Sequence, residues 1–286
     1  MYIDVIGEGT LGRSGDLAEA VKRGSVDIAI LPATSLWRQW PELSELGQSA
    51  PISDPEQMMG LSQSTRFLSR VNEIGERSYG LGVLSIGWEF SVLVGRKGGL
   101  SDDALHGGTF LIPRAAKEFA KPIDEVDLPT KLIRRTGASS IAVELRDIPN
   151  ALGSVMVNGA LVRVDALLGE TLESKWLDDY GQLQWSDDYV LFPTPIVVIV
   201  NTTSYVYQEI FQTFSEHSAY SCLDETRRFN MSTFERARAL AGKARGGGIS
   251  VIEVTDIWKD AFRSVTAKQG SPSDKIAEAV REELLN

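Results

Sequence analysis

Two stretches of the sequence decide the fold of this chain. The first is GSVDIAILPATSLWRQWPELSELGQSA, from Gly24 to Ala50. The second spans Leu105–Gly159, opens with LHGGTFLIPR and closes with DIPNALGSVMVNG. Within the first, Val26–Leu31 is a short and nearly continuous apolar run, typical of a parallel strand buried on both faces. Within the second, Thr109–Ile112 has the same character. Both runs lead into turns and helix-like segments.

The same alternation continues outward from these stretches along the chain. Ser14–Arg23 is a predicted helix with Ser14 as its N-cap and Gly24 as its C-terminal stop. Such alternation predicts an α/β protein with mostly parallel sheets. The other predicted strands are Tyr2–Ile6, Leu81–Ile86, Ile196–Val200 and Ile249–Val254, with a new block beginning at Glu89–Val94. The other predicted helices are Gln57–Glu76, Arg114–Ala120, Asp127–Gly137, Asp147–Ser154, Thr202–Arg245 with a break near His217–Ser221 left open, Asp256–Val265 and Ser273–Leu285.

Composition excludes several classes of protein. The chain has 286 residues, of which 43% are hydrophobic, enough for one large or two modest domains. The net charge is −10 and no basic run contains interleaved aromatics, which argues against nucleic-acid binding. No apolar stretch approaches the roughly 20 residues of a membrane span. The single cysteine, Cys222, excludes an intramolecular disulfide and a cysteine-based zinc site.

A search for catalytic residues finds no convincing set. The chain has two histidines, His106 and His217, in polar surroundings without nearby metal ligands, and it has no G-x-S-x-G motif. Gly7–Gly12 reads G-x-G-x-x-G, but a dinucleotide site needs an acidic residue at the end of the second strand. Asp27 begins that strand instead, which favours a glycine-rich turn over the nucleotide alternative. The sequence therefore predicts no enzyme, no cofactor and no metal.

The two opening stretches, taken in order, resemble the DctP-type solute-binding proteins of tripartite ATP-independent periplasmic (TRAP) transporters. The resemblance covers nearly the whole chain, although no single motif is decisive. The residues that carry it are Ile3–Ile6, Gly9–Gly12, Val21, Gly24, Val26–Ile28, Pro41–Leu43, Asp102–Pro113, Gly137–Ala138, Asp147–Gly159 and Val197–Asn201.

The resemblance implies a receptor with two lobes that close over a small solute by a hinge motion and then dock on a membrane permease. The expected lobe I comprises residues 1–87 and 194–220, and lobe II comprises 88–193 and 221–265. Residues 266–286 form a C-terminal helix. In the family a first strand and a first long helix precede the position of Tyr2, after a signal peptide. We therefore expect a periplasmic protein whose start is truncated here.

The resemblance also places the ligand site and shows where this chain departs from the family. The family arginine that holds a carboxylate falls on Leu111, a second arginine falls on Glu89, and an asparagine falls on Val162. Arg114 follows that motif and either restores carboxylate binding or is a surface charge at a helix start. Glu89 beside Trp88 either binds an amine or forms a surface salt bridge.

Further candidates complete the predicted ligand-binding set. Trp37 and Trp40 follow the strand Val26–Leu31 and either line the lobe I wall or anchor the loop. The full set is Trp37, Trp88, Glu89, Arg114, Val162, Arg163 and Asn201. Leu111 and Glu89 motivate the hypothesis that the solute is a zwitterion, an amine or an aromatic compound rather than a plain dicarboxylate. A ligand-sensing protein with this fold and no transport role is the alternative function.

Overall fold

The computed structural model describes residues 6, 11, 14–36, 38–44, 46, 54–113, 128–144, 147–164, 167, 181–185, 192–208, 217–267 and 275–284. The strands are β1 Ile28–Pro32, β2 Leu81–Gly95, β3 Thr109–Pro113, β4 Ser139–Val143, β5 Gly159–Arg163, β6 Gln182–Gln184, β7 Phe192–Asn201 and β8 Ser250–Ile252. The helices are α1 Ser14–Lys22, η1 Ala33–Leu36, α2 Pro41–Ser44, α3 Pro55–Gln63, α4 Thr65–Tyr79, α5 Asp102–Leu105, α7 Leu128–Arg135, α8 Ile148–Leu152, α11 Tyr205–Gln208, α12 His217–Gly246, α13 Asp256–Ala267 and α14 Lys275–Leu284.

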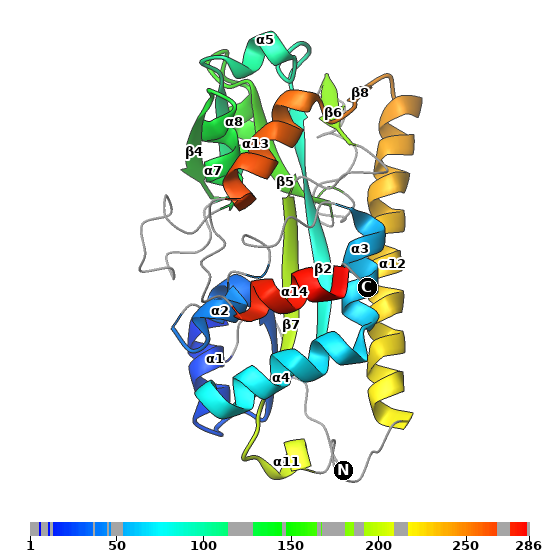
Figure 1. Cartoon of the computed structure of the whole chain (residues 1–286). Coiled ribbons are helices and arrows are strands. Elements are labelled where there is room, and N and C mark those ends of the chain that lie inside the picture. The colour runs from blue at the N-terminus through cyan, green and yellow to red at the C-terminus, as the bar shows by residue number, and fades with distance from the viewer. Residues whose placement is uncertain are drawn as a thin grey trace.

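The described strands form one mixed sheet in the order β1-β7-β2-β5-β3-β4, with β6 and β8 added beside β2. Strands β2 and β7 run through the middle of the elongated molecule and connect its two halves (Figure 1). The pairs β1–β7, β2–β7, β2–β5 and β2–β6 are antiparallel, whereas β3–β4, β3–β5 and β6–β8 are parallel. The prediction of mostly parallel sheets is therefore wrong. A continuous apolar run indicates burial on both faces, and here α helices bury the antiparallel strands as well.

Strand β2 is longer than the sequence indicated. Leu81–Ile86 and Glu89–Val94 belong to one strand, which pairs with β7 from Leu81 to Ser91. In the sequence, Gly87 separates the two predicted segments, and the reason for a glycine at this position is packing. A Cβ atom built on Gly87 would lie 3.0 Å from a ring carbon of Phe229 in α12, so glycine lets α12 approach the strand.

Two long predicted helices are divided in the structure. Gln57–Glu76 becomes α3 and α4, which meet at Ser64. The Ser64 hydroxyl accepts a hydrogen bond from the Phe67 N–H at 3.0 Å and caps α4. Thr202–Arg245 becomes α11 and α12, with α12 beginning at His217. The glycine stops are confirmed, since Gly24 and Gly80 have φ of 73° and 68°. The predictions for Tyr2–Val5 and Arg114–Ala120 lie outside the described residues.

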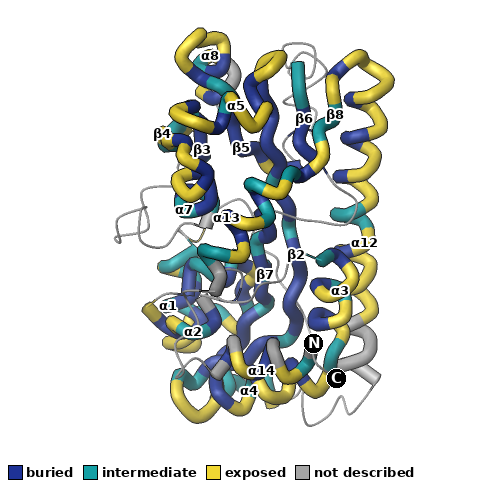
Figure 2. The backbone as a smooth tube through the Cα atoms, turned by 45° about the horizontal axis from the view of Figure 1, so that its top comes forward, coloured by how far each residue is buried: buried dark blue, intermediate teal, exposed yellow. Residues whose placement is uncertain are grey.

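Buried side chains form two clusters around the sheet. The first extends from the lower half along β2 to α12 and includes Trp40 and Trp88. The second fills the upper half under α13, where Trp258 meets Phe110 and Phe192 edge to face at 6.5 and 5.9 Å. Figure 2 shows β2 and β7 as almost wholly buried, with the exposed residues on the outer surfaces of the helices. Helix α12 passes along both halves (Figure 1).

Candidate functional site

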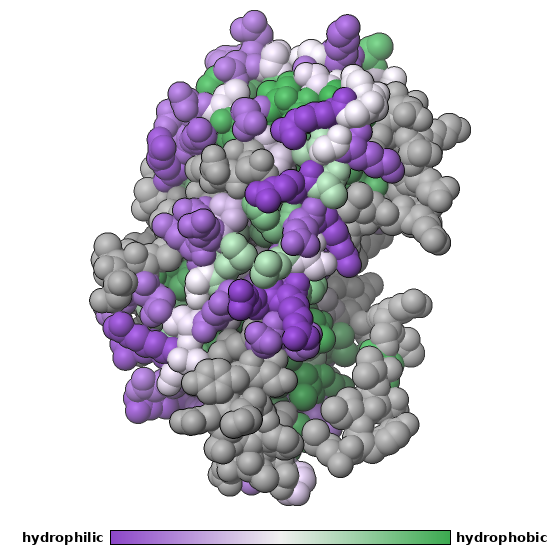
Figure 3. Space-filling view, turned by 90° about the vertical axis from the view of Figure 1, so that its right-hand side faces the viewer, coloured by the Kyte–Doolittle hydropathy of each residue, from purple (hydrophilic) through white to green (hydrophobic). Residues whose placement is uncertain are grey.

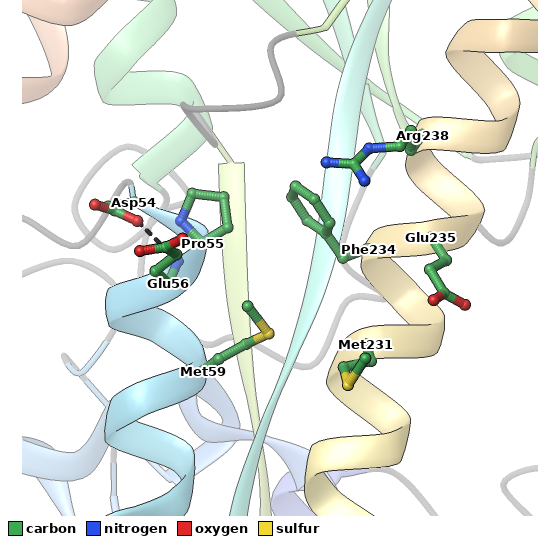
Figure 4. A pocket seen from close by; sticks show the side chains of 8 residues that line it. All are labelled: Asp54, Pro55, Glu56, Met59, Met231, Phe234, Glu235 and Arg238. Atoms are coloured by element: carbon green, nitrogen blue, oxygen red, sulfur yellow. Dashed lines mark hydrogen bonds between the residues drawn. The ribbon is translucent and has the colours of Figure 1, made fainter.

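A cavity of about 490 Å³ lies between α3 and α12. Its volume falls within the range of about 300–1,000 Å³ that is usual for small-molecule sites. Four lining residues come from the start of α3 and four from α12. They are Asp54, Pro55, Glu56 and Met59 on α3, and Met231, Phe234, Glu235 and Arg238 on α12. Figure 4 shows these two walls facing each other across β2. We call this space the α3–α12 cavity.

The α3 wall is the first turn of a capped helix. Asp54 is the N-cap, and its carboxylate accepts hydrogen bonds from the N–H groups of Glu56 and Gln57 at 2.7 and 3.4 Å. Pro55 occupies the first helical position, where its fixed φ suits the helix. Because the Asp54 carboxylate already occupies the N-terminal N–H groups, this helix end offers negative charge to the cavity.

The α12 wall is one face of a long helix, because its four residues follow the helical spacing i, i+3, i+4 and i+7. Phe234 lies at the centre of this wall. Its ring meets Phe90 of β2 edge to face at 6.1 Å and lies 5.7 Å from Trp185. The Arg238 guanidinium lies 5.2 Å from the centre of the Phe234 ring, within cation–π range. This wall therefore presents an aromatic surface with one cation at its upper end.

Trp88, a residue of β2, forms hydrogen bonds with both α3 and α12. Its indole N–H lies 3.0 Å from the Met58 carbonyl oxygen and 2.9 Å from the Ser62 hydroxyl oxygen, both on α3. Its backbone N–H donates to Oδ1 of Asn230 on α12 at 2.8 Å. The Trp88 side chain is only 1% exposed, so these bonds are shielded from water. The predicted ligand residue Trp88 is therefore not among the lining residues, and instead it links β2 to α3 and α12.

The cavity carries more negative than positive charge. Its lining has three carboxylates, those of Asp54, Glu56 and Glu235, and one guanidinium, that of Arg238. In Figure 4, Arg238 and Phe234 point toward α3, whereas Glu235 points away from it. Figure 3 views the molecule from the α12 side and shows hydrophobic groups between hydrophilic ones on this face. The arrangement suits a ligand with an apolar body and a positively charged group.

Among the predicted site residues, the structure brings Glu89 and Arg163 together. The Arg163 guanidinium lies 2.9 Å from the Glu89 carboxylate, and both side chains are partly exposed. Arg163 pairs with Ser91 across β2 and β5, so Glu89, Ser91 and Arg163 share one face of the sheet. Phe90, which contacts Phe234, faces the other way. The ion pair therefore lies on the opposite face from the α3–α12 cavity.

Val162 and Leu111 lie on the face of the sheet that α12 covers. Val162 pairs with Val92, and Leu111 pairs with Ala160, two residues before Val162 on the same strand. Their side chains are 0% and 2% exposed and belong to the first core cluster. Both positions at which the resemblance places polar family residues are thus apolar core here.

Asn201 lies far from Glu89. Its amide nitrogen donates to the carbonyls of Val21 and Lys22, both at 3.0 Å, and its oxygen accepts from the backbone N–H and the hydroxyl of Thr203. These bonds cap the C-terminus of α1 and the turn after β7. Thr194, the partner of Glu89 on β7, is seven residues away, about 23 Å at about 3.3 Å per residue.

The two remaining predicted residues, Trp37 and Arg114, lie outside the described part of the chain. Trp40, the neighbour of Trp37 in the sequence, is fully buried and stacks on Tyr79 with ring centres 5.6 Å apart. For Trp40 the alternative of a loop anchor therefore fits the structure.

The sequence did not point to the eight residues of the α3–α12 cavity. Two local signals were present. Asp54-Pro55-Glu56 is a helix start with an N-cap and proline at the first position. Phe234 and Arg238 are four residues apart, the spacing for contact on one helix face. Within the described ranges, no group of three or more His, Cys, Asp or Glu side chains could hold a metal ion. Nor does a helix in this part of the chain meet the length and hydropathy of a membrane span.

Comparisons with known proteins add a structural relationship. No protein-family model and no curated protein matches the sequence. A TRAP periplasmic solute binding protein from Rhodobacter sphaeroides, in an apo open form, matches with a TM-score of 0.70 and 15% identity, over 97% of this chain and 86% of that one. A TRAP periplasmic solute binding protein from Citrobacter koseri, also in an apo open form, matches with a TM-score of 0.68 and 14% identity, over 96% of this chain and 86% of that one.

A third match is a TRAP periplasmic solute binding protein from Chromohalobacter salexigens with bound D-glucuronate. It matches with a TM-score of 0.66 and 14% identity, over 96% of this chain and 85% of that one. At these identities the likeness concerns the fold. It confirms the expected α/β architecture, and the chain has the fold of the TRAP periplasmic solute-binding proteins.

Proposed function

We propose that this protein is an extracytoplasmic solute-binding protein that captures a small organic solute and delivers it to a TRAP-type membrane permease. The observation that carries this proposal is the α3–α12 cavity, which lies in a chain that has the fold of such receptors over 97% of its length. The proposed location is the periplasm, and the proposed partners are the solute and the permease subunits.

The proteins with the same fold support a small polar or charged solute. Those from Chromohalobacter salexigens and Rhodoferax ferrireducens hold D-glucuronate and malonate. That from Desulfovibrio desulfuricans holds sn-glycerol-3-phosphate. A volume of about 490 Å³ accommodates molecules of this size. We propose a binding role rather than catalysis, consistent with the absence of a recognisable catalytic set in the sequence.

The proposed lobes place the cavity between moving parts. With lobe I as residues 1–87 and 194–220, α3 belongs to lobe I. With lobe II as 88–193 and 221–265, the Met231–Arg238 segment of α12 belongs to lobe II. A solute in the cavity would then contact both lobes, and contacts made only in the closed form would drive closure. The helix at 266–286 is a separate unit in this scheme, and α14 packs against α4.

Some sequence candidates stay in the proposal beside the cavity. Arg114 and Trp37 are proposed solute contacts on the strength of the resemblance alone. The Glu89–Arg163 pair, which is partly exposed, stays a proposed polar contact at a separate position, because it lies on the face of the sheet opposite the cavity. Leu111, buried where the family has its arginine, also favours the sensing alternative, in which the protein binds a solute without delivering it to a permease.

A thermal-shift screen of organic acids, amino acids, amines and sugars, followed by calorimetry, tests the binding proposal. A solute at 100 times its Kd adds about 2.7 kcal/mol to the free energy of unfolding. Phe234→Ala removes the central ring of the cavity and is expected to abolish this gain, whereas Phe229→Ala, outside the lining, is the matched control. A broad library without any binder contradicts the proposal. Uptake by permease-containing vesicles only in the presence of the protein separates transport from sensing.

A further inference from the structure

We infer that the solute of the α3–α12 cavity carries a protonated amine at one end, an apolar and preferably aromatic body, and a carboxylate at the other end. This inference rests on the proposed function and specifies the class of solute. It comes from the distribution of charge and apolar surface over the two walls.

The α3 wall favours a cation. Asp54 and Glu56 place two carboxylates of the cavity lining in one helical turn. The N–H groups that make a helix N-terminus attractive to anions are here occupied by the Asp54 carboxylate itself. An anionic group of a solute would meet repulsion at this wall, whereas an ammonium group would meet two negative charges.

The middle of the cavity favours an apolar body. Phe234 points from α12 toward Pro55, and Met59 and Met231 lie below them (Figure 4). Phe90 and Trp185 pack against Phe234, which fixes its ring. Flat rings are well suited to such a surface because they stack on aromatic faces and contact thioether groups favourably.

The upper end of the α12 wall supplies the positive charge. Arg238 is the cation among the eight lining residues, and its guanidinium carbon lies 5.2 Å from the centre of the Phe234 ring. A planar guanidinium can bind a carboxylate with two parallel hydrogen bonds. A solute carboxylate at Arg238 then directs the amine toward α3, whereas a dicarboxylate would place its second carboxylate against Asp54 and Glu56.

Four probes with matched structures test this inference by calorimetry at low ionic strength. 3-[4-(2-Aminoethyl)phenyl]propionate has the amine and the carboxylate at opposite ends of a ring. 2-Phenylethylamine lacks the carboxylate arm, 3-phenylpropionate lacks the amine arm, and 6-aminohexanoate lacks the ring. We expect the full probe to bind most tightly and 3-phenylpropionate at least about tenfold more weakly, because it leaves the α3 carboxylates without a cation. 6-Aminohexanoate is expected to be the weaker of the two zwitterions.

Variants that remove charges from the lining test whether the probes bind in the α3–α12 cavity. Asp54→Asn with Glu56→Gln removes both α3 charges, and asparagine retains the N-cap. The double variant is expected to weaken 2-phenylethylamine about fivefold to tenfold and to leave 3-phenylpropionate unchanged or tighter. Glu225→Gln is the matched control, because Glu225 lies on α12 outside the cavity lining and its exposed side chain pairs with Arg228, and its effect is expected to stay below about twofold.

The outcomes separate this inference from the proposed function. Equal affinity for 3-phenylpropionate and 3-[4-(2-aminoethyl)phenyl]propionate overturns the inference, as does a double variant that binds 2-phenylethylamine like the parent. Tight binding of a dicarboxylate with no binding of the amine probes also overturns it, while leaving the solute-binding function in place. The proposed function fails only when the broad library contains no binder.

Discussion

The backbone N–H of Trp88 donates to Oδ1 of Asn230 at 2.8 Å, across 142 residues of sequence. Below residue 91, the described strands leave this edge of β2 without a neighbouring strand. Asn230 supplies the missing acceptor at Trp88. Asn72 of α4 does the same at Val83, where its side chain bonds both the N–H and the carbonyl. Asn230 on α12 and Asn72 on α4 thus supply hydrogen bonds that a neighbouring strand would otherwise supply.

Asn230→Ala is expected to destabilise the protein by about 1–3 kcal/mol, because it leaves the buried N–H of Trp88 without an acceptor. The measurement is urea unfolding, compared at the midpoint. Ser232→Ala, two residues away on α12, is the control and is expected to change the free energy of unfolding by less than about 0.5 kcal/mol. Equal stability of the parent and Asn230→Ala would show that water replaces the asparagine.

Trp88→Phe is expected to loosen α3. The variant keeps an aromatic ring but loses the indole N–H that bonds Met58 and Ser62. The lost bonds and the smaller ring together cost about 2–4 kcal/mol. Ser62→Ala removes one of the two acceptors and is expected to cost less. Hydrogen exchange of the α3 amides measures the local effect, and unchanged exchange in Trp88→Phe contradicts the anchoring role.

Gly75→Ala is expected to destabilise the fold by about 1–3 kcal/mol through overpacking. A Cβ atom at this position would lie 2.3 Å from both the Leu81 carbonyl oxygen and the Trp40 ring. Gly242→Ala on α12 is the matched control, since nothing lies within 4 Å of its Cβ position. The control is expected to raise stability by about 0.5–1 kcal/mol, because alanine has the better helix propensity. Thermal unfolding of both variants checks the contrast.

Burial, together with the hydrogen bond and the negative charge of Glu42, raises the pKa of Tyr79 from 10.0 to about 12. Because the folded-state pKa is the higher one, the resulting stabilisation is complete below about pH 10 and is lost as the pH rises toward 12. The excess loss of stability over this interval should be absent in Tyr79→Phe. Difference absorbance of the phenolate between the parent and Tyr79→Phe gives the pKa directly.

Glu42→Gln tests the cause of that shift. The variant removes the charge of Glu42 but retains the burial of Tyr79, which is the larger cause. The pKa of Tyr79 is therefore expected to fall only part of the way toward 10. A pKa that stays at about 12 would show that Glu42 contributes nothing.

The sequence predicted the elements whose signals are local. Gly24, Gly80 and Gly137 end helices as expected, and all three have positive φ. The sequence could not predict that Gly87 lies inside one long strand, because the reason is the ring of Phe229, 142 residues later. The prediction of mostly parallel strands was wrong because a continuous apolar run indicates only burial on both faces. Parallel and antiparallel strands can both be buried in this way.

The candidate site was predicted less well than the fold. The resemblance directed attention to Glu89, Val162 and Leu111, and two of these are in the apolar core. The cavity depends instead on Asp54 and Phe234, which are 180 residues apart and belong to ordinary-looking helix faces. Only the packing of α3 and α12 against β2 brings these residues together.

The covering of β2 by Asn230 also has a consequence for folding. The two residues are 142 positions apart, so β2 can pair with β7 before α12 has docked. In that state the outer edge of β2 has unsatisfied backbone groups and can pair with a strand of another chain. We therefore expect the chain to be most prone to aggregation until α12 has docked, whether it folds during synthesis or after export.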